Sequence, residues 1–361
     1  MSLEQTLNEL RYGGPEVRIR AAINLAQANN PQVTPYLIDA LHDEEPEVRV
    51  AISRALITYR DPRSVPALIS LLKDKNFVVT EAAATTLGLI GDPAAGKPLL
   101  DLMERAKAFG PNTYPQHQSV VQAIVALGRI KDPHATGAMI KMLKKGYKNS
   151  VSDWLLQVRQ AAALGLGMLD QPAGTEALIE TLREDERPEV RASATTALGM
   201  LRSENSFRQM VANLSMSTFE NQARLWRRQE GIVIALGQRG DREAVPYLLP
   251  LVHSPYPEVR IALAETMVRL GETEKGEILI QLLRDRSPDV RHAAAQALGQ
   301  LGIQAAAGPL SAVAVDPDRR VAIAALTALE NIKALPSAPT AGPTAYLPTA
   351  NPQPPDENSG S

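Results

Sequence analysis

Arginine stands at a nearly constant interval along this sequence, and a regular row of guanidinium groups could bind anions along one face of a protein. Ten segments align without gaps on an Arg, a small residue two places later and a Leu seven places later, and seven of them keep the Arg. The aligned positions are Arg18, Arg49, Thr80, Val120, Arg159, Arg191, Gln229, Arg260, Arg291 and Arg319.

An aspartate stands six residues before several of these arginines, which favours a structural role for the row. Carboxylates and guanidinium groups form strong hydrogen bonds of defined geometry. We therefore expect an Asp-Arg ladder that ties helix turns together within each repeat. Asp74 precedes Thr80 by the same spacing, so the third repeat should lack the pair. The expected pairs are Asp43 with Arg49, Asp153 with Arg159, Asp185 with Arg191, and Asp285 with Arg291.

The motifs of metal and nucleophile chemistry are missing from the sequence. Cysteine is absent, which excludes thiol nucleophiles, disulfides and Cys-based metal sites. No phosphate-binding Gly-rich loop or Gly-x-Ser-x-Gly segment occurs. We expect no catalytic residue, no metal and no cofactor. The five histidines are scattered singly, without a zinc-binding helix motif, at His42, His117, His134, His253 and His292.

Two basic segments are candidates for a binding surface. Six basic residues stand against one acidic residue from Arg129 to Lys148, and Arg224-Leu-Trp-Arg-Arg228 forms the second segment. Aromatic residues gather beside them, and Trp, Tyr and Arg dominate interface hot spots. We expect a basic rim that binds an acidic protein; alternatively, the Lys residues solvate a helix and the Trp residues fill gaps in the stack. The rim residues are Phe109, Tyr114, His117, Lys144, Lys145, Tyr147, Trp154, Arg224, Trp226, Arg227 and Arg228.

The elements that carry these residues repeat along the chain. Most intervals between aligned positions are about 30 residues, a period typical of stacked supersecondary units. In one repeat, Asp61 can cap a helix, Pro62 suits its first turn, and a second helix from Val78 to Ile90 follows. Period-two alternation of β-branched residues is absent. The sequence predicts an all-α fold, a right-handed α-solenoid of about ten helical hairpins over residues 1–333.

Three longer intervals place extra residues between the first and second helix of a hairpin. These insertions are Glu104 to Ser119, Gly146 to Leu155, and Asn213 to Leu225. Because insertions at one topological position emerge on one edge of a solenoid, we expect all three on a common edge.

The balance of charge excludes several classes of partner. Lys plus Arg total 38 against 40 Asp plus Glu, so no overall field attracts nucleic acid or an anionic membrane.

Neither a signal-peptide pattern at the N-terminus nor a run of about 18 apolar residues occurs. We expect a cytoplasmic protein.

The repeat pattern resembles a known family. Pro257 to Arg260, Ala297 to Gly299, and Gly240 to Leu248 together are similar to the HEAT-like repeat of phycobilisome (phycocyanobilin) lyases. The resemblance covers roughly residues 1 to 333. Similar repeats occur in di-iron deoxyhypusine hydroxylases, but their His-Glu pairs are replaced here by His42-Asp43 and His292-Ala293.

The resemblance implies three functions. The first is a non-catalytic scaffold for a photosynthetic or cofactor-assembly protein, which binds through its concave face and the rim. The second is a phycocyanobilin lyase, which presents a linear tetrapyrrole to a Cys of a phycobiliprotein and usually works with an unlike HEAT-repeat subunit. The third is an accessory protein that binds an iron-sulfur carrier.

The composition changes after Lys333 to Pro, Ala, Thr, Asn and Ser. Such a segment cannot bury a core, so residues 334–361 are predicted to be a disordered Pro-rich tail. Only Tyr346-Leu347 offers an apolar point there.

Deleting the tail after Lys333 should leave the thermal melting curve unchanged, because the tail has little apolar surface to bury. Circular dichroism melts of the full and shortened chains test this. A loss of cooperativity in the shortened chain would show that the tail packs on the solenoid.

Overall fold

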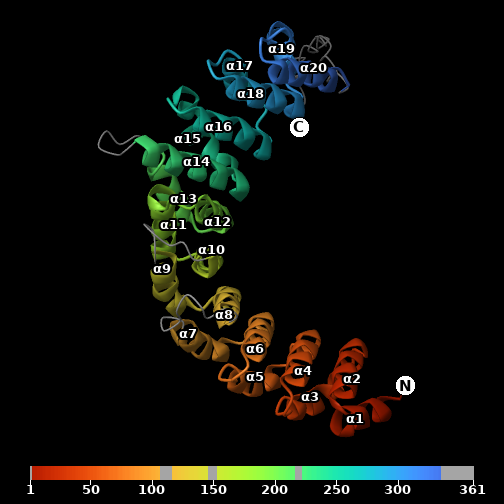
Figure 1. Cartoon of the computed structure of the whole chain (residues 1–361). Helices are drawn as coiled ribbons and strands as arrows, with labels where there is room; N and C mark the ends of the chain where they lie inside the picture. Colours follow the sequence, from red (N-terminus) through yellow and green to blue (C-terminus); the bar gives the residue numbers. More distant parts are fainter. Residues whose placement is uncertain (1, 106–115, 145–152, 216–221, 335–361) are drawn as a thin grey trace, which may run out of the picture.

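The chain forms a curved stack of helical hairpins. The computed structural model describes residues 2–105, 116–144, 153–215 and 222–334. Each hairpin consists of an outer helix and an inner helix, and the inner helices line the concave side of an arc (Figure 1). The described residues contain twenty α-helices and no strand, which confirms the prediction of an all-α solenoid with ten hairpins.

The outer helices form the convex side of the arc, and most follow a short 3-10 turn. They are α1 (Leu3–Tyr12), α3 (Thr34–Ala40), α5 (Val65–Leu71), α7 (Gly96–Arg105), α9 (Thr136–Lys144), α11 (Pro172–Glu184), α13 (Glu204–Ala212), α15 (Val245–Leu248), α17 (Gly276–Leu282) and α19 (Ala307–Val313).

The inner helices lie side by side along the concave side. They are α2 (Pro15–Gln27), α4 (Pro46–Tyr59), α6 (Phe77–Ile90), α8 (Gln116–Ile130), α10 (Asp153–Leu169), α12 (Pro188–Met200), α14 (Gln222–Arg239), α16 (Pro257–Arg269), α18 (Pro288–Leu301) and α20 (Arg319–Ala334).

Local sequence sets where the hairpins begin and end. The Asp61 side chain accepts a hydrogen bond from the Arg63 N–H at 2.9 Å, and the following Pro62 begins a 3-10 turn that leads into α5. Asp92 caps the next hairpin in the same way. Gly91 ends α6 with a φ of 80°, a left-handed conformation that glycine adopts without strain. These caps confirm the predicted boundaries of the hairpin that begins at Asp61.

Small residues allow the inner helices to approach one another closely. A Cβ atom placed on Gly88 of α6 would lie 2.6 Å from the Cα of Ala126 in α8. Gly167 meets Ala197 in the same way, at 2.8 Å. Since real Cβ atoms do not approach other atoms so closely, only glycine fits these crossings. The aliphatic side chains then fill the remaining space as one continuous core.

An Asp-Arg ladder joins neighbouring repeats along the edge where outer helices turn into inner helices. Arg291 of α18, for example, binds both carboxylate oxygens of Asp316, with Nε 2.7 Å from Oδ2 and Nη2 2.8 Å from Oδ1. Each Arg reaches an Asp 25 or 26 residues further along the chain. The described pairs are Arg18–Asp43, Arg49–Asp74, Arg159–Asp185, Arg260–Asp285 and Arg291–Asp316.

The direction of the ladder corrects the sequence prediction, which paired each Asp with the Arg of its own repeat. Arg49 donates to the backbone carbonyl of Asp43 at 2.7 Å, whereas the Asp43 carboxylate pairs with Arg18. Asp74, expected to lack a partner, pairs with Arg49. Asp43 therefore binds the arginines of two repeats, that of the preceding repeat through its carboxylate and that of its own repeat through its carbonyl.

The other predicted ladder pairs follow the same rule. Arg191 and Arg291 donate to the backbone carbonyls of Asp185 and Asp285, each at 2.9 Å. Arg159 is buried, pairs with Asp185 and donates to the Leu143 carbonyl at 2.9 Å. The side chain of Asp153 lies outside the described residues.

The last aligned position also needs correction. At six of the aligned positions the N–H donates to the carbonyl of the residue just before the inner helix, four residues earlier, as Arg291 does to Ser287 at 3.2 Å. In the last repeat Ala322 makes the equivalent bond, to the Asp318 carbonyl at 3.1 Å. Asp316, which pairs with Arg291, stands six residues before Ala322, as the other ladder aspartates stand before their aligned residues. The aligned position of the last repeat is therefore Ala322, three residues after Arg319, and Arg319 is not a ladder position.

Truncating the core should destabilise the protein more than breaking one rung of the ladder. Leu298 is 0% exposed, so Leu298→Ala should lower the free energy of unfolding by about 2 to 5 kcal/mol. Arg291→Ala should cost about 1 to 3 kcal/mol, because Asp316 loses a charged partner. Denaturant unfolding measures both, with the exposed Arg286→Ala as control. A larger loss for Arg291→Ala would show that the ladder dominates stability.

The close helix crossing predicts an unusual cost for a small substitution. Gly88→Ala should lower stability by about 1 to 3 kcal/mol, because the added methyl group overlaps the backbone of α8. Gly137→Ala in α9 is the matched control, since its Cβ would meet nothing within 4 Å. The control should be neutral or stabilising by up to about 1 kcal/mol in the same unfolding assay. Equal effects at both positions would contradict the tight crossing.

Candidate functional site

The predicted rim falls partly outside the described residues. Phe109, Tyr114, Lys145 and Tyr147 lie there, and Trp154 belongs to α10 but its side chain is not described. The three internal gaps in the description each separate an outer helix from the inner helix of the same hairpin. For these residues the rim stays a prediction.

His117 lies beneath the surface on which the sequence analysis placed it. Its side chain is 1% exposed at the start of α8. Burial lowers the pKa of the His117 imidazole, because loss of water disfavours the charged form. A partner cannot contact this side chain without opening the stack, which corrects its assignment to the rim.

Two basic residues of the rim already bind acidic residues of α11. Lys144 at the end of α9 pairs with Glu180, and Arg224 of α14 lies 3.1 Å from Glu184. Both pairs are exposed enough for water to weaken them. Because α11 supplies the compensating charge, the basic character of this region is smaller than the sequence suggests.

Some residues in the first turns of α14 hold the stack together, and others remain accessible to a partner. Arg228 is buried and donates to the Ser215 carbonyl at 3.2 Å, and the neighbouring Gln229 donates to the Leu214 carbonyl at 2.7 Å. Both tie α14 to the turn that follows α13. Trp226 is half-buried against the core, and the Arg227 guanidinium carbon lies 5.7 Å from the centre of its ring. Trp226 and Arg227 remain candidates for partner contact, whereas Arg228 holds the stack together.

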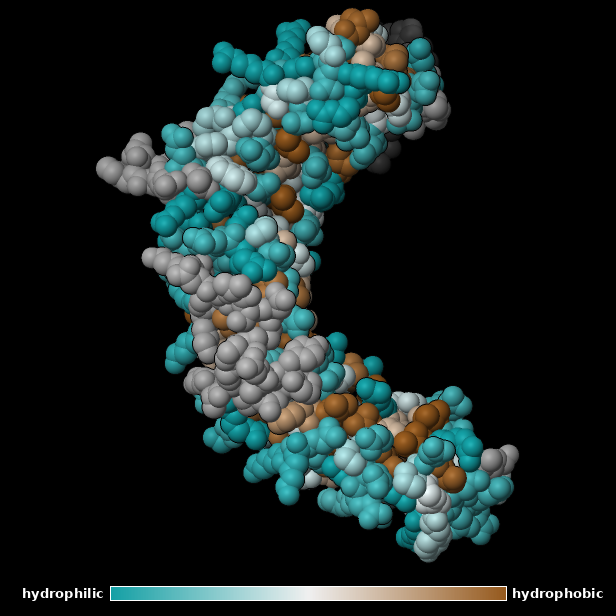
Figure 2. Space-filling model, in the orientation of Figure 1, coloured by the Kyte–Doolittle hydropathy of each residue, from teal (hydrophilic) through white to brown (hydrophobic). Residues whose placement is uncertain are grey.

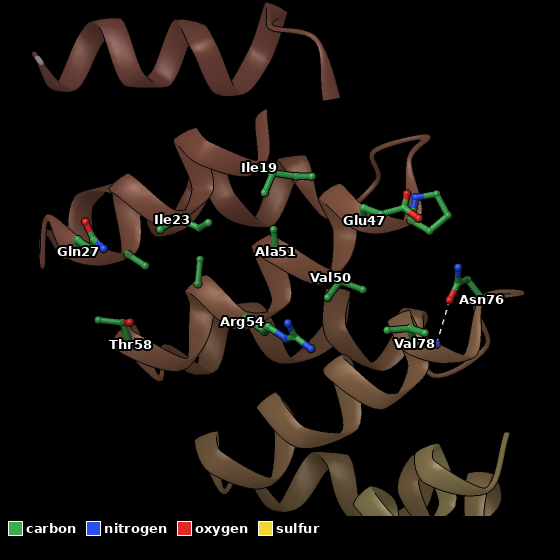
Figure 3. A pocket seen from close by; sticks show the side chains of 13 residues that line it. Ile19, Ile23, Gln27, Glu47, Val50, Ala51, Arg54, Thr58, Asn76 and Val78 are labelled. Carbon is green, nitrogen blue, oxygen red and sulfur yellow. Dashed lines mark hydrogen bonds between the residues drawn. The ribbon is translucent and has the colours of Figure 1, made fainter. Parts of the chain in front are cut away.

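An apolar groove on the concave side was missed by the sequence analysis. It lies between α2 and α4, extends to the start of α6 and has a volume of about 580 Å³. Figure 3 shows Ile19 and Ile23 of α2 on one wall and Val50 of α4 on the other, with Val78 of α6 at one end. Ile23 is 47% exposed and Val78 is 44% exposed, although both are large aliphatic residues. Apolar side chains gather on this part of the inner face in Figure 2.

Few polar groups line the groove. Gln27 and Thr58 lie at one end and Asn76 at the other, where its side chain accepts the Val78 N–H at 2.9 Å and so caps α6 (Figure 3). Glu47 and Arg54 are its charged residues. Such a surface can bury apolar side chains but offers little to satisfy the backbone of a ligand.

The sequence carries only a weak signal for the groove. The inner-face positions two before, one after and five after the aligned positions hold four aliphatic residues in the first three repeats, Ile19, Ile23, Val50 and Val78, and five polar or charged ones. Later repeats also hold aliphatic residues at some of these positions, such as Val121, Ile234 and Ile261. The groove therefore becomes visible only after the structure shows which side chains meet between neighbouring inner helices.

Metal-binding clusters and membrane spans are both absent from the described residues. They contain no group of three or more His, Asp or Glu side chains that could hold a metal ion. Nor does the described part of the chain include a helix sufficiently long and apolar to cross a membrane.

Known structures share this architecture. The karyopherin Kap121p bound to the extreme C-terminus of the protein phosphatase Cdc14p is 15% identical, with a TM-score of 0.59, and the match covers 91% of this chain and 42% of that one. Kap121p bound to Nup53p is 16% identical, with a TM-score of 0.58 and coverages of 91% and 41%. At these identities the likeness shows the solenoid fold alone, and this chain spans about two fifths of Kap121p.

Sequence comparison identifies the repeat. No curated protein matches the chain. The model of HEAT repeats, however, matches residues 3–71, 34–109, 151–219, 224–285 and 276–341, which together cover most of the sequence. With twenty helices stacked as hairpins around one core, the chain belongs to the HEAT repeat family.

Proposed function

We propose that this protein is a non-catalytic scaffold that binds an apolar segment of a partner protein in the groove between α2 and α4. The observation that carries the proposal is the exposure of Ile23 and Val78 around a concave, aliphatic groove. Such residues are usually buried, and a concave patch of them is typical of a binding site. In the Kap121p structures a solenoid of similar fold is bound to protein partners, which is consistent with this role.

The groove favours a helical segment as its occupant. Its walls are two inner helices, and its polar side chains lie mainly toward the ends. An extended peptide would leave its backbone N–H and C=O groups without partners in the middle, whereas a helix satisfies its own backbone groups. An amphipathic helix could therefore lie between α2 and α4, with aliphatic residues at i, i+3 and i+7 facing Ile19, Ile23 and Val50.

The finer predictions of the sequence analysis concern the identity of the client. A photosynthetic or cofactor-assembly protein, a bilin-lyase activity on phycobiliproteins, and binding to an iron-sulfur carrier all rest on the resemblance of the repeat. The HEAT family match is common to the three and favours none of them. Co-expression with a bilin and a candidate client separates them, since only a lyase produces a covalently coloured client.

Placing a charge in the groove should weaken partner binding without unfolding the protein. Ile23→Asp changes an exposed side chain, so the fold should tolerate it, but a carboxylate would be desolvated against the aliphatic residues of the partner. We expect at least a tenfold increase in Kd. The measurement is isothermal titration of each variant with a partner isolated on the native protein and then purified.

Ile323→Asp is the matched control, because Ile323 of α20 is 52% exposed and lies outside the groove. Its affinity should equal that of the unchanged protein. If Ile23→Asp remains folded and binds the purified partner as tightly as the control does, the groove is not the binding site.

A further inference from the structure

One arginine of the ladder lacks the carboxylate that its equivalents bind. Arg191 keeps the bonds to its own repeat, because its Nη1 donates to the carbonyls of Asp185 at 2.9 Å and Glu186 at 3.0 Å. Arg291 makes the same two contacts, to Asp285 at 2.9 Å and Arg286 at 3.3 Å. The guanidinium of Arg191 is therefore anchored as in the paired repeats.

The guanidinium edge of Arg191 that faces the next repeat differs from that of the other ladder arginines in its partners. In Arg260 and Arg291 the Nε and Nη2 atoms bind an Asp carboxylate 25 residues ahead. The residues 25 and 26 positions after Arg191 are Met216 and Ser217, which carry no carboxylate. Within the described part of the chain Arg191 forms no ion pair, so the edge that binds Asp elsewhere is left without one.

A second guanidinium, that of Arg227, lies on the neighbouring inner helix. Arg227 belongs to α14, which packs against α12, the helix that carries Arg191. Its Nε is buried and has no hydrogen-bond partner, while the guanidinium stacks against Trp226. Burial and then the positive charge of Arg227 lower the pKa of Arg191, whereas the negative charges of Glu230 and Glu189 act in the opposite direction.

The nearby carboxylates do not complete the site. Glu189 lies 3.3 Å from Arg187, with which it pairs. Burial and the negative charge of Glu258 raise the pKa of Glu230, while the positive charge of Arg191 opposes this shift. In the described residues neither forms an ion pair with Arg191 or Arg227.

We propose that Arg191 and Arg227 form a binding site for a carboxylate, which takes an Asp or Glu side chain of the partner protein. The incoming carboxylate occupies the position that an Asp of the next repeat holds elsewhere in the ladder. It accepts hydrogen bonds from the free edge of Arg191 and from Arg227, and it relieves the repulsion between the two cations. This inference rests on the proposed function, because it names the chemistry of the same partner.

Trp226 provides a local reporter for the test. The chain has two Trp residues, so Trp154→Phe leaves Trp226 as the single emitter beside Arg227. The full chain with this change is titrated with acetyl-Leu-Asp-Leu-amide, with its Asn counterpart and with inorganic phosphate. We expect a saturable change in Trp226 emission with the Asp peptide, and binding at least fivefold weaker with the Asn peptide. Tighter binding of phosphate than of the Asp peptide would overturn the assignment to a carboxylate.

Three variants assign the effect to the two arginines. Arg191→Lys keeps the charge but not the two-pronged geometry, and Arg227→Gln removes a charge; each should weaken binding of the Asp peptide at least fivefold. Arg224→Gln is the matched control, because this cation of the same helix pairs with Glu184. Its affinity should be unchanged. Equal affinities in all three variants, with melting curves intact, would overturn the proposal.

The same variants separate this inference from the groove. If Ile23→Asp weakens binding of the purified partner while Arg191→Lys and Arg227→Gln do not, the groove holds and the carboxylate site fails. If only the arginine variants weaken it, the carboxylate site holds and the groove fails.

Discussion

Close contact between neighbouring inner helices is the constraint on which the rest of the structure depends. A single hairpin cannot bury its apolar side alone, so each repeat obtains a core only by packing on the next. Glycine and alanine at the crossings, such as Gly88 against Ala126 and Gly167 against Ala197, bring the helix backbones together. A larger residue at these crossings would separate the layers and open space among the buried aliphatic side chains.

The ladder follows from this packing. Because neighbouring inner helices lie so close, an Arg near the start of one helix can reach the turn before the next. The Asp in that turn binds the Arg of the preceding repeat with its carboxylate and accepts from the Arg of its own repeat with its carbonyl, as Asp285 does with Arg260 and Arg291. Where an insertion replaces that turn, as after Arg191, the anchored guanidinium remains and the carboxylate is absent.

The concave face carries different chemistry along its length. Aliphatic residues of the first three repeats form the groove around Ile23 and Val78, whereas α12, α14 and α16 present charged groups, among them Arg227 and Glu258. A partner with an apolar helix and an acidic side chain would match both regions. The stacked helices provide a rigid frame, so the side chains on their inner faces decide what binds.

The sequence by itself determined the repeat, the hairpins, their caps and the location of the insertions, since period, capping and helical spacing are local properties of the chain. It could not determine which repeat's Arg binds each Asp carboxylate. In a 31-residue period, an Asp six residues before one Arg is also 25 residues after the preceding Arg, so the two pairings have the same signature.

The sequence also could not determine which side chains are exposed. Val78 and Val79 are adjacent valines, yet the first is exposed in the groove and the second is buried; His117, assigned to the surface, is buried as well. Which side of a helix meets the core, the neighbouring repeat or solvent depends on the stacking direction and curvature of the solenoid. Those are set by contacts between residues far apart in the chain, so only the tertiary structure decided where the groove and the unpaired arginine lie.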